Sequence, residues 1–293
     1  LAAGNSVPWS TAAARPRRST GWVGFIRWVA RRKRSAILRG RKLVDERVPR
    51  PAGEKVLRWA LKEGLTSPLF GPAMKVGQAV RGMLPATLKA KVPAAQAAGV
   101  WPTAQHPRKV LMLAGCVQPA MMPNINAATA RVLDAAGIQT VIAPQAGCCG
   151  AVKFHLNDQD GGRAEMRANI DAWWPFIAAG EVEAIVMNAS GCGVTVREYG
   201  HFLKDDPAYA AKADRVGALT RDLSELLPEL VAALRTSRPD RVPGPPTGDA
   251  GAGRQLAFHP PCSLQHGQQL RGGVEQHLPG GHDAGTAGAA QHE

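Results

Sequence analysis

The sequence predicts an α/β fold in which helices flank a parallel sheet. Three short apolar runs are typical of buried strands, and they occupy residues 110–115, 139–143 and 183–188. Helical patterns at about 124–136 and 162–179 separate these runs, and each ends at a glycine (Gly137 and Gly180), which favours a helix C-cap. Strand–helix–strand alternation at this spacing indicates parallel strands joined by right-handed crossovers.

The segments before and after these strands are predicted to be mainly helical. Apolar residues at helical spacing predict a helix at 54–62 that Gly64 closes, followed by short helices at 70–83 and 84–91. Further helices are expected at 195–203, 207–216 and 219–234. We therefore divide the chain into a basic irregular segment (1–41), a helical segment with a linker (42–107), a first α/β domain (108–235), a Pro/Gly-rich linker (236–253) and the start of a second repeat (254–293).

The second repeat is predicted from two similar openings. Arg108-Lys-Val-Leu-Met-Leu-Ala-Gly-Cys116 is matched by Arg254-Gln-Leu-Ala-Phe-His-Pro-Pro-Cys262, and in both a basic residue precedes the cysteine by eight positions. The first opening is followed 32 residues later by a cysteine pair, which in the second would fall near position 294 of this 293-residue chain. Residues 279–290 also lack periodicity, so we expect the second repeat to be incomplete.

The charge of the chain is local rather than general. Residues 1–50 hold 13 Lys and Arg and two acids, so +11 of the net +13 lies there and only +2 in the other 243 residues. The near-neutral body argues against a general nucleic-acid-binding protein. With 45% hydrophobic residues the chain can form a core, and no apolar run approaches the ~20 residues that a membrane helix needs.

Residues 1–41 differ from the rest of the chain in composition and periodicity. They start with Leu, contain Arg31-Arg32-Lys33-Arg34 and three tryptophans, and show no periodicity. Three interpretations stay open: out-of-frame translation of a GC-rich gene, a functional basic arm, or a targeting segment.

Four of the five cysteines follow the predicted strands. Cys116 ends the first run, Cys148 and Cys149 follow the second, and Cys192 follows the third in a glycine-flanked loop. Loops after parallel strands gather at one edge of a sheet, where ligands bind. Thiolates select iron–sulfur clusters, zinc or copper(I), and an adjacent pair suits a multi-iron cluster better than one tetrahedral zinc. The alternative is that these cysteines are small buried hydrophobes.

The glycines beside these cysteines (Gly115, Gly147, Gly150, Gly191 and Gly193) would let the backbone approach a bulky cluster. Adjacent cysteines in a chain of this length are unlike a secreted disulfide framework, so a reducing cytosol is expected.

Other polar and aromatic residues receive structural interpretations. Asn188 and Ser190 are expected to orient the Cys192 loop, and Trp173-Trp174 to lie in the core or at a partner contact. His155 is expected to be a surface or capping residue, and His259 and His266 flank Cys262. No phosphate loop, Ser/His/Asp triad or carboxylate pair is present, so no catalytic residue is predicted.

The cysteine spacing resembles a known family. The pattern Cys116-x31-Cys148-Cys149-Gly150-x41-Cys192, restarting at His259-Pro-Pro-Cys262, is similar to that of the cysteine-rich "CCG" family. That family includes the cysteine-rich subunit of heterodisulfide reductase and the iron–sulfur subunits of glycolate, lactate and anaerobic glycerol-3-phosphate oxidoreductases. The phrases Arg50-Pro-Ala-Gly-Glu-Lys, Leu65-Thr-Ser-Pro-Leu-Phe-Gly-Pro and His259-Pro-Pro-Cys-Ser-Leu-Gln-His-Gly-Gln resemble the glycolate oxidase iron–sulfur subunits most.

The resemblance covers roughly residues 41–277 and implies a Rossmann-like domain that binds an iron–sulfur cluster of the 4Fe–4S type. Cys116, Cys148, Cys149 and Cys192 match the ligands of the first repeat, and Cys262 matches the opening of the second. The chain would be a non-catalytic electron-transfer subunit. A flavoprotein partner would carry FAD and oxidise glycolate to glyoxylate. The expected location is the cytoplasm or the inner face of the cell membrane, peripherally bound, without nucleic acid.

The sequence departs from the family pattern in three ways. The Cys-x2-Cys-x2-Cys-x3-Cys-Pro motifs of the family's ferredoxin-like module are absent, Thr195 replaces the last cysteine of the closing Cys-x-x-Cys, and the second cysteine pair is missing. These departures suggest a frame-shifted or truncated copy.

Two alternative functions follow. One is a heterodisulfide-reductase-like subunit, or a lactate or glycerol-3-phosphate dehydrogenase iron–sulfur subunit. The other belongs to a different class, a nucleic-acid-binding protein that uses the basic arm 15–41.

Overall fold

A four-stranded parallel sheet forms the centre of the protein. The computed structural model describes residue 40 and residues 42–237 and 261–270. The sheet order is β2-β1-β3-β4, with β1 (Arg108–Met112), β2 (Ile138–Val141), β3 (Ala184–Met187) and β4 (Thr220–Asp222). Val110 of β1 pairs with Thr140 of β2 and Ala184 of β3, and every pairing is parallel. The predicted α/β fold with a parallel sheet is confirmed.

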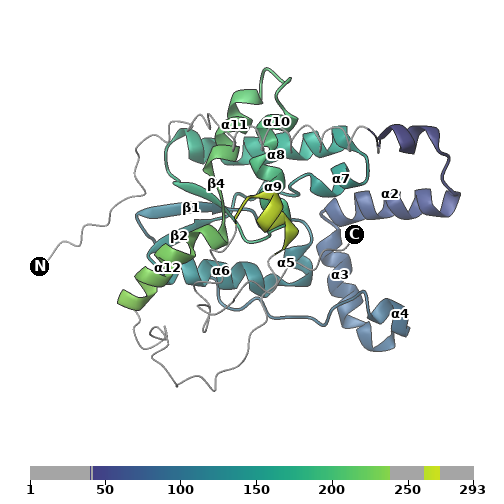
Figure 1. Cartoon of the computed structure of the whole chain (residues 1–293). Helices are drawn as coiled ribbons and strands as arrows, with labels where there is room; N and C mark the ends of the chain where they lie inside the picture. Colours follow the sequence, from purple (N-terminus) through teal and green to yellow (C-terminus); the bar gives the residue numbers. More distant parts are fainter. Residues whose placement is uncertain (1–39, 41, 238–260, 271–293) are drawn as a thin grey trace, which may run out of the picture.

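Helices cover both faces of the sheet (Figure 1). On one face lie α6 (Pro123–Ala135) and α12 (Leu223–Ser237). The other face is covered by α8 (Gln159–Ala178), α9 (Ser190–Arg197), α10 (Tyr199–Phe202) and α11 (Ala210–Leu219). This three-layer arrangement is the consequence of a sheet that is apolar on both sides.

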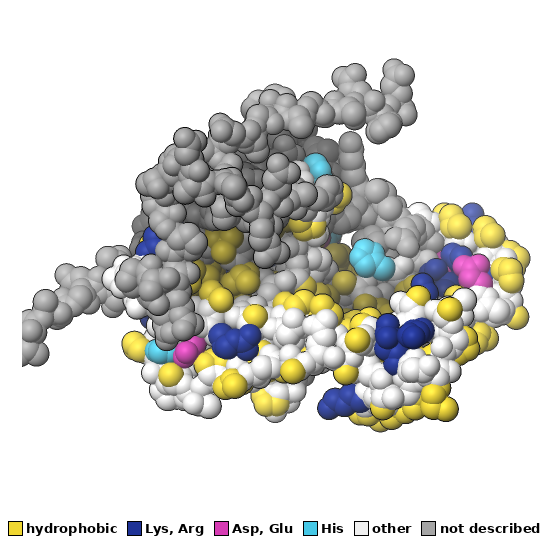
Figure 2. Space-filling model, turned by 90° about the horizontal axis from the view of Figure 1, so that it is seen from below, with side chains coloured by type: hydrophobic (Ala, Val, Ile, Leu, Met, Phe, Trp, Pro, Cys, Tyr) yellow, Lys and Arg dark blue, Asp and Glu magenta, His cyan; other side chains and the backbone are white. Residues whose placement is uncertain are grey.

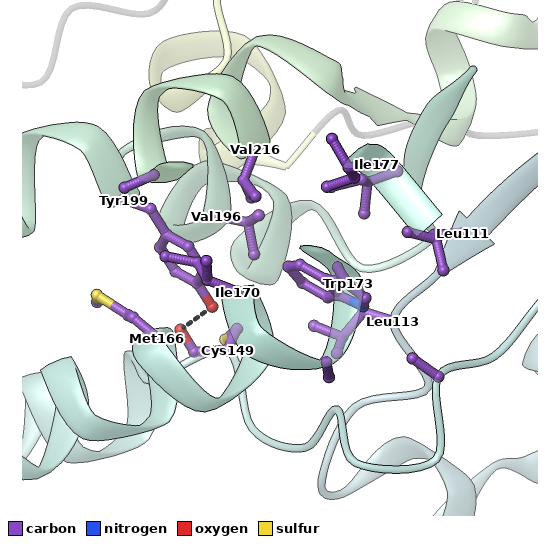
Figure 3. Packing of buried hydrophobic residues seen from close by; sticks show 14 of the residues in the cluster. Leu111, Leu113, Cys149, Met166, Ile170, Trp173, Ile177, Val196, Tyr199 and Val216 are labelled. Atoms are coloured by element: carbon purple, nitrogen blue, oxygen red, sulfur yellow. Dashed lines mark hydrogen bonds between the residues drawn. The ribbon is translucent and has the colours of Figure 1, made fainter. Parts of the chain in front are cut away.

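The strands alternate their side chains between two apolar clusters. Val110, Ala184 and Val186 pack with Leu133 of α6 and Leu230 of α12. On the other face of the sheet, the larger cluster combines strand residues with residues of α8, α9, α10 and α11 (Figure 3). Its members include Leu111, Ile185, Met187, Met166, Ile170, Trp173, Val196, Tyr199 and Val216.

A helical segment precedes the sheet, as expected. It consists of α2 (Ala52–Thr66), α3 (Phe70–Ala79), the 3-10 turn η1 (Arg81–Met83) and α4 (Ala86–Lys89), and none of these elements contains a buried residue. Gly64 does not close α2, because a helical glycine costs only ~1 kcal/mol. The helix ends instead at Thr66, and Ser67 is extended because Pro68 follows it.

Two helix predictions around the third and fourth strands were wrong. The helix expected at 195–203 begins earlier, at Ser190, so Cys192 lies in the first turn of α9 and not in a loop. The helix expected at 219–234 begins only at Leu223, because Thr220–Asp222 form β4 at the sheet edge. Two further short helices, α5 (Gln118–Met121) and α7 (Ala151–His155), had no sequence prediction.

Several sequence predictions lie outside the described residues. They concern the basic segment 1–39, most of the linker at 236–253, the strand-like start of the second repeat with His259, and residues 271–293. The division into domains therefore remains a prediction. Within the described ranges, no helix combines the length and apolarity needed to cross a membrane.

The two adjacent tryptophans allow a test of the core. Trp173 is fully buried in the larger cluster, whereas Trp174 packs only partly against it and lies 5.4 Å from Lys212 Nζ, measured to the ring centroid. We expect Trp173→Ala to lower the free energy of unfolding by ~3–5 kcal/mol and Trp174→Ala by only about 1 kcal/mol. Urea unfolding of both variants measures this, and equal losses would contradict the placement.

Candidate functional site

The four cysteines that follow β1, β2 and β3 meet at the carboxyl edge of the sheet. Because these three strands are neighbours in the order β2-β1-β3, the segments after them converge at the point where the sheet order reverses. This is the usual ligand-binding edge of an open parallel sheet. The structure therefore brings together the residues that the sequence proposed: Cys116, Cys148, Cys149 and Cys192.

The four thiols form a continuous row. The Cys148 side chain hydrogen-bonds to the thiols of Cys116 and Cys149, and Cys149 in turn contacts the thiol of Cys192. Cys148 and Cys149 are each only 3% exposed, whereas Cys116 and Cys192 at the two ends are half-buried. All are free thiols. The row thus has a buried middle and two ends closer to solvent.

Hydrogen bonding along the row separates the acidities of the thiols. The thiols of Cys116 and Cys149 donate to Cys148 and hold its pKa at about 3, helped by the backbone N–H groups of Gly150 and Val152. The pKa of Cys192 is likewise lowered, by the Cys149 thiol. The pKa values of Cys116 and Cys149 are raised, because each donates to Cys148 and is desolvated. The thiolate is the metal-binding form of cysteine, and the lowered pKa values favour this form at Cys148 and Cys192.

Asn169 and Tyr199 hold the turn that carries the cysteine pair (Figure 3). Asn169 Oδ1 accepts from the Gly147 N–H at 2.8 Å, while its Nδ2 donates to the Cys148 carbonyl at 2.7 Å and to Tyr199 Oη at 3.1 Å. Tyr199 Oη donates to the Cys149 carbonyl at 3.0 Å. Both residues are fully buried. Neither was predicted from the sequence, although a lone Asn on the apolar side of the 162–179 helix was an available signal.

The glycines beside the cysteines divide into two groups. A Cβ at Gly115, Gly147 or Gly191 would meet no atom within 4 Å. A Cβ at Gly150 would lie 2.7 Å from the Gly162 carbonyl, and both Gly115 (φ +82°) and Gly150 (φ +89°) have left-handed backbone. A Cβ at Gly193 would lie 3.0 Å from the amide of Gln268. At Gly150 and Gly193 the absence of a side chain therefore permits close packing, while the Gly150 N–H also donates to Cys148 Sγ at 3.4 Å.

A second polar network holds the Cys116 side. Gln118, two residues after Cys116, donates through Nε2 to Asn126 Oδ1 at 2.6 Å and to Asn188 Oδ1 at 3.0 Å. Asn188 Nδ2 donates to Asn126 Oδ1 and to Thr129 Oγ1. Asn188 was expected to orient the Cys192 segment, but these contacts tie the end of β3 to α6 and to the segment after β1.

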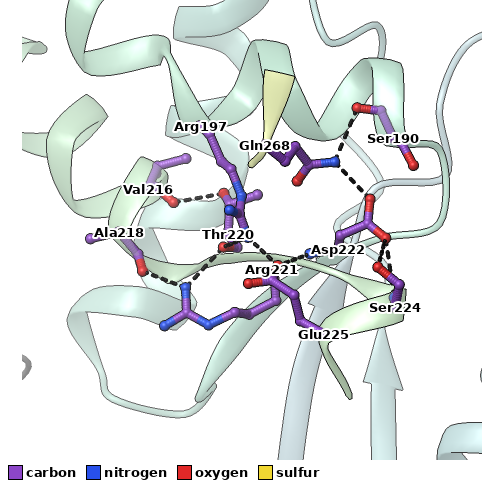
Figure 4. A network of polar contacts seen from close by, with 10 residues as sticks. All are labelled: Ser190, Arg197, Val216, Ala218, Thr220, Arg221, Asp222, Ser224, Glu225 and Gln268. Carbon is purple, nitrogen blue, oxygen red and sulfur yellow. Dashed lines mark hydrogen bonds and ion pairs between the residues drawn. The ribbon is translucent and has the colours of Figure 1, made fainter. Parts of the chain in front are cut away.

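Residues 261–270, the described part of the predicted second repeat, lie against the Cys192 helix. Residues 263–267 form the short helix η2 (Ser263–Gly267), which packs on α9. Gln268 is buried, and its Nε2 donates to Asp222 Oδ2 at 2.7 Å and to the Ser190 carbonyl at 3.3 Å (Figure 4). Ser190 thus contributes its backbone carbonyl, not its side chain, to this contact with Gln268. The first turn of α9 is therefore held by Gln268 of the segment 261–270.

The C-terminal half of α9 is held by Arg197. Its Nη2 donates to the Thr220 carbonyl at 3.2 Å and pairs with Glu225, which also accepts from the Asp222 N–H at 2.7 Å (Figure 4). Burial lowers the pKa of Arg197. These contacts fix α9 against the edge strand β4.

The remaining predicted residues lie outside the row. Cys262 is exposed at the start of η2. Thr195, at the place of the closing family cysteine, donates through Oγ1 to the Gly191 carbonyl at 3.2 Å. His155 ends α7, and His266 lies in η2.

The row fits a polynuclear group better than one ion. Among the described residues, no three His, Cys, Asp or Glu side chains are arranged to hold a single metal ion. Four soft donors spread along a row, with open space before three glycines, suit a cluster in which each thiolate binds a different metal atom.

Comparison with known proteins assigns this part of the chain. Residues 110–197 match the model of the cysteine-rich domain family, CCG. Over these residues the chain is similar to CCG domains. Its three cysteine segments are the ones described above, so the family match and the geometry mark the same edge of the sheet.

Curated relatives extend the similarity beyond the CCG domain. The chain is 48% identical over 241 residues to the glycolate oxidase iron–sulfur subunit of Escherichia coli K12, covering 82% of this chain and 56% of that protein. It is 36% identical over 123 residues to the probable glycolate oxidase iron–sulfur subunit of Bacillus subtilis 168, covering 42% and 27%. Lactate utilization protein A of Bacillus velezensis is 27% identical over 119 residues, covering 41% and 48%.

The chain therefore spans little more than half the length of its E. coli relative. No solved structure gives a significant match to the chain. The fold is therefore known from the contacts within this chain alone.

The turn that carries the cysteine pair can be tested through its two holders. Asn169→Ala removes the partner of the part-buried Gly147 N–H and the Asn169 bond to the buried Cys148 carbonyl, so we expect a loss of about 2–3 kcal/mol in unfolding free energy. Tyr199→Phe keeps the ring and removes two hydrogen bonds, the one donated to the Cys149 carbonyl and the one accepted from Asn169 Nδ2. We expect a smaller loss, of about 1–2 kcal/mol, because Asn169 keeps its bonds to Gly147 and Cys148. Urea denaturation measures both, and a Tyr199→Phe loss as large as that of Asn169→Ala would contradict the assignment.

Gln268 and its neighbour Gln269 provide a matched pair for the contact with α9. Gln268→Ala removes the bonds to Asp222 and Ser190, and we expect faster iodoacetamide labelling of Cys192 in the cluster-free protein, measured by peptide mass spectrometry. Gln269 is exposed and bonds only locally, to the His266 carbonyl, so Gln269→Ala should leave the rate unchanged. Equal rates in both variants would show that Gln268 does not hold the helix.

Proposed function

We propose that this chain is an iron–sulfur electron-transfer subunit of a glycolate oxidase. The observation that carries the proposal is the row of four thiols at the carboxyl edge of a CCG domain, in a chain 48% identical to a protein named as such a subunit. The chain would relay electrons and leave the oxidation of glycolate to another subunit.

Cys116, Cys148, Cys149 and Cys192 would hold the cluster, which we propose to be of the 4Fe–4S type. Bound there, it would supply one-electron transfer at a potential set by hydrogen bonds and solvent exposure. The Gly150 N–H, 3.4 Å from Cys148 Sγ, is one such hydrogen bond. Asn169 and Tyr199 would keep the buried pair in place, and the packing around it would exclude water. Cys262 would belong to the second repeat and lies outside the row.

The proposed partner is a flavoprotein subunit whose FAD accepts two electrons from glycolate and yields glyoxylate. This chain would receive those electrons one at a time and pass them on. We place the complex in the cytoplasm or peripherally on the inner face of the cell membrane. The name of the E. coli relative, a subunit of a larger oxidase, supports the existence of partner subunits.

Iron and sulfide analysis after anaerobic reconstitution tests the cluster. Cys149 is buried and contacts the thiols on both sides, so Cys149→Ser should remove most of the bound iron and acid-labile sulfide. Cys262→Ser changes an exposed cysteine and should leave both contents at the wild-type value. Unchanged iron and sulfide in Cys149→Ser would rule out the ligand role.

A second function is favoured by the direct contact between the Cys116 and Cys148 thiols. In thiol–disulfide exchange, the Cys148 thiolate would attack a disulfide substrate and release one thiol. Cys116 would then displace the second thiol, leaving a Cys116–Cys148 disulfide. Stoichiometric loss of these two thiols on adding a disulfide, without bound iron, would favour this function over electron transfer.

A further inference from the structure

The helical segment before the CCG domain exposes large apolar side chains. We call this surface the α3–α4 face. Met83 is 87% exposed, Leu69 72% and Val76 64%. The face consists of Leu69, Lys75, Val76, Val80, Arg81, Met83, Leu88, Lys89 and Lys91. Exposed apolar groups gathered in this way mark interaction sites on folded proteins.

The charge of the α3–α4 face has one sign. Residues 64–133 contain seven Lys and Arg and no Asp or Glu. Lys75, Lys89 and Lys91 are exposed, while Arg81 Nε donates to the Val92 carbonyl at 2.8 Å. Figure 2 views the molecule from this side and shows dark-blue side chains among yellow ones on the part formed by α3 and α4. A surface of this kind is complementary to an acidic one.

The face also adjoins the cysteine site. Helix α3 packs against α5, which begins two residues after Cys116, and Gln78 Nε2 of α3 donates to the Ala120 carbonyl of α5 at 3.4 Å. Cys116 is the end of the thiol row on this side and is half-buried, unlike the central pair. A protein bound to the α3–α4 face would therefore lie on the side of the molecule where Cys116 ends the row, with α3 and α5 between the face and the thiol.

We propose that the α3–α4 face is the docking surface for an acidic surface of the redox protein that exchanges electrons with the cysteine site. This inference rests on the proposed function. The apolar side chains form the centre of the contact, and the lysines form a charged rim. The rim speeds association, and this electrostatic effect weakens as the salt concentration rises. The position of the face on the Cys116 side favours a redox protein over a lipid surface as the occupant, because only a redox protein would exchange electrons with the cysteine site.

Binding of the flavoprotein subunit of the same organism's glycolate oxidase tests the proposal. The reconstituted full chain is immobilised and the dissociation constant is measured by biolayer interferometry at two salt concentrations. We expect Met83→Asp and Lys89→Glu each to weaken binding about tenfold or more, with the Lys89→Glu effect shrinking at high salt. Both residues are exposed, so the fold should be preserved.

Lys204→Glu is the matched control. It makes the same charge change on an exposed lysine after α10, far along the chain from the face, and should leave the dissociation constant unchanged. If Lys204→Glu and Lys89→Glu weaken binding equally, the loss of affinity is explained by net charge alone, and the proposed docking surface is wrong.

Three other results would also overturn it. These are no binding by the wild-type chain, unchanged binding by Met83→Asp, and binding of the face to phosphatidylglycerol vesicles or to a second copy of the chain with the flavoprotein contact intact. Iron and sulfide are measured on the same samples. A normal cluster without flavoprotein binding refutes the docking surface alone, whereas absence of a cluster in the wild-type chain refutes the proposed function.

Discussion

The side-by-side parallel pairing of β2, β1 and β3 is the constraint on which the site depends. Cysteines that are 32 and 43 residues apart along the chain reach each other only because three neighbouring strands end at the same edge. The crossover helices that make this possible bury the two apolar clusters. Loss of packing at Trp173 or Leu133 would therefore disperse the thiols as well as weaken the core.

Buried polar side chains then fix what the strands bring together. Asn169 serves three partners around the cysteine pair, and Gln118, Asn126 and Asn188 form the corresponding network behind Cys116. A buried polar group that lost its partners would cost about 1–3 kcal/mol, so each network resists rearrangement. The row is thus held by the protein independently of anything bound to it, which is the property expected of a preorganised site.

Much of this could be predicted from the sequence, and the failures have clear causes. Apolar runs ending at glycine-flanked cysteines located three strands and the four thiols. The strand β4 was missed because Thr220–Asp222 is only three residues long and lies between helix-forming stretches. Asn169, Tyr199 and Gln268 were missed because their partners are 21 to 78 residues away. Local sequence patterns predict which residues are buried and whether a segment is a helix or a strand. They do not predict which polar groups distant in the sequence will pair.

The two ends of the row differ in what surrounds them. At the Cys192 end, the segment 261–270 packs on α9, and the Gln268 amide lies against Gly193. At the Cys116 end, α5 is backed by α3, whose outer apolar side chains are exposed. The chain therefore already covers one end with its own residues and leaves a cationic, apolar surface beside the other. If electrons enter or leave through a bound protein, this asymmetry directs that protein to the Cys116 end.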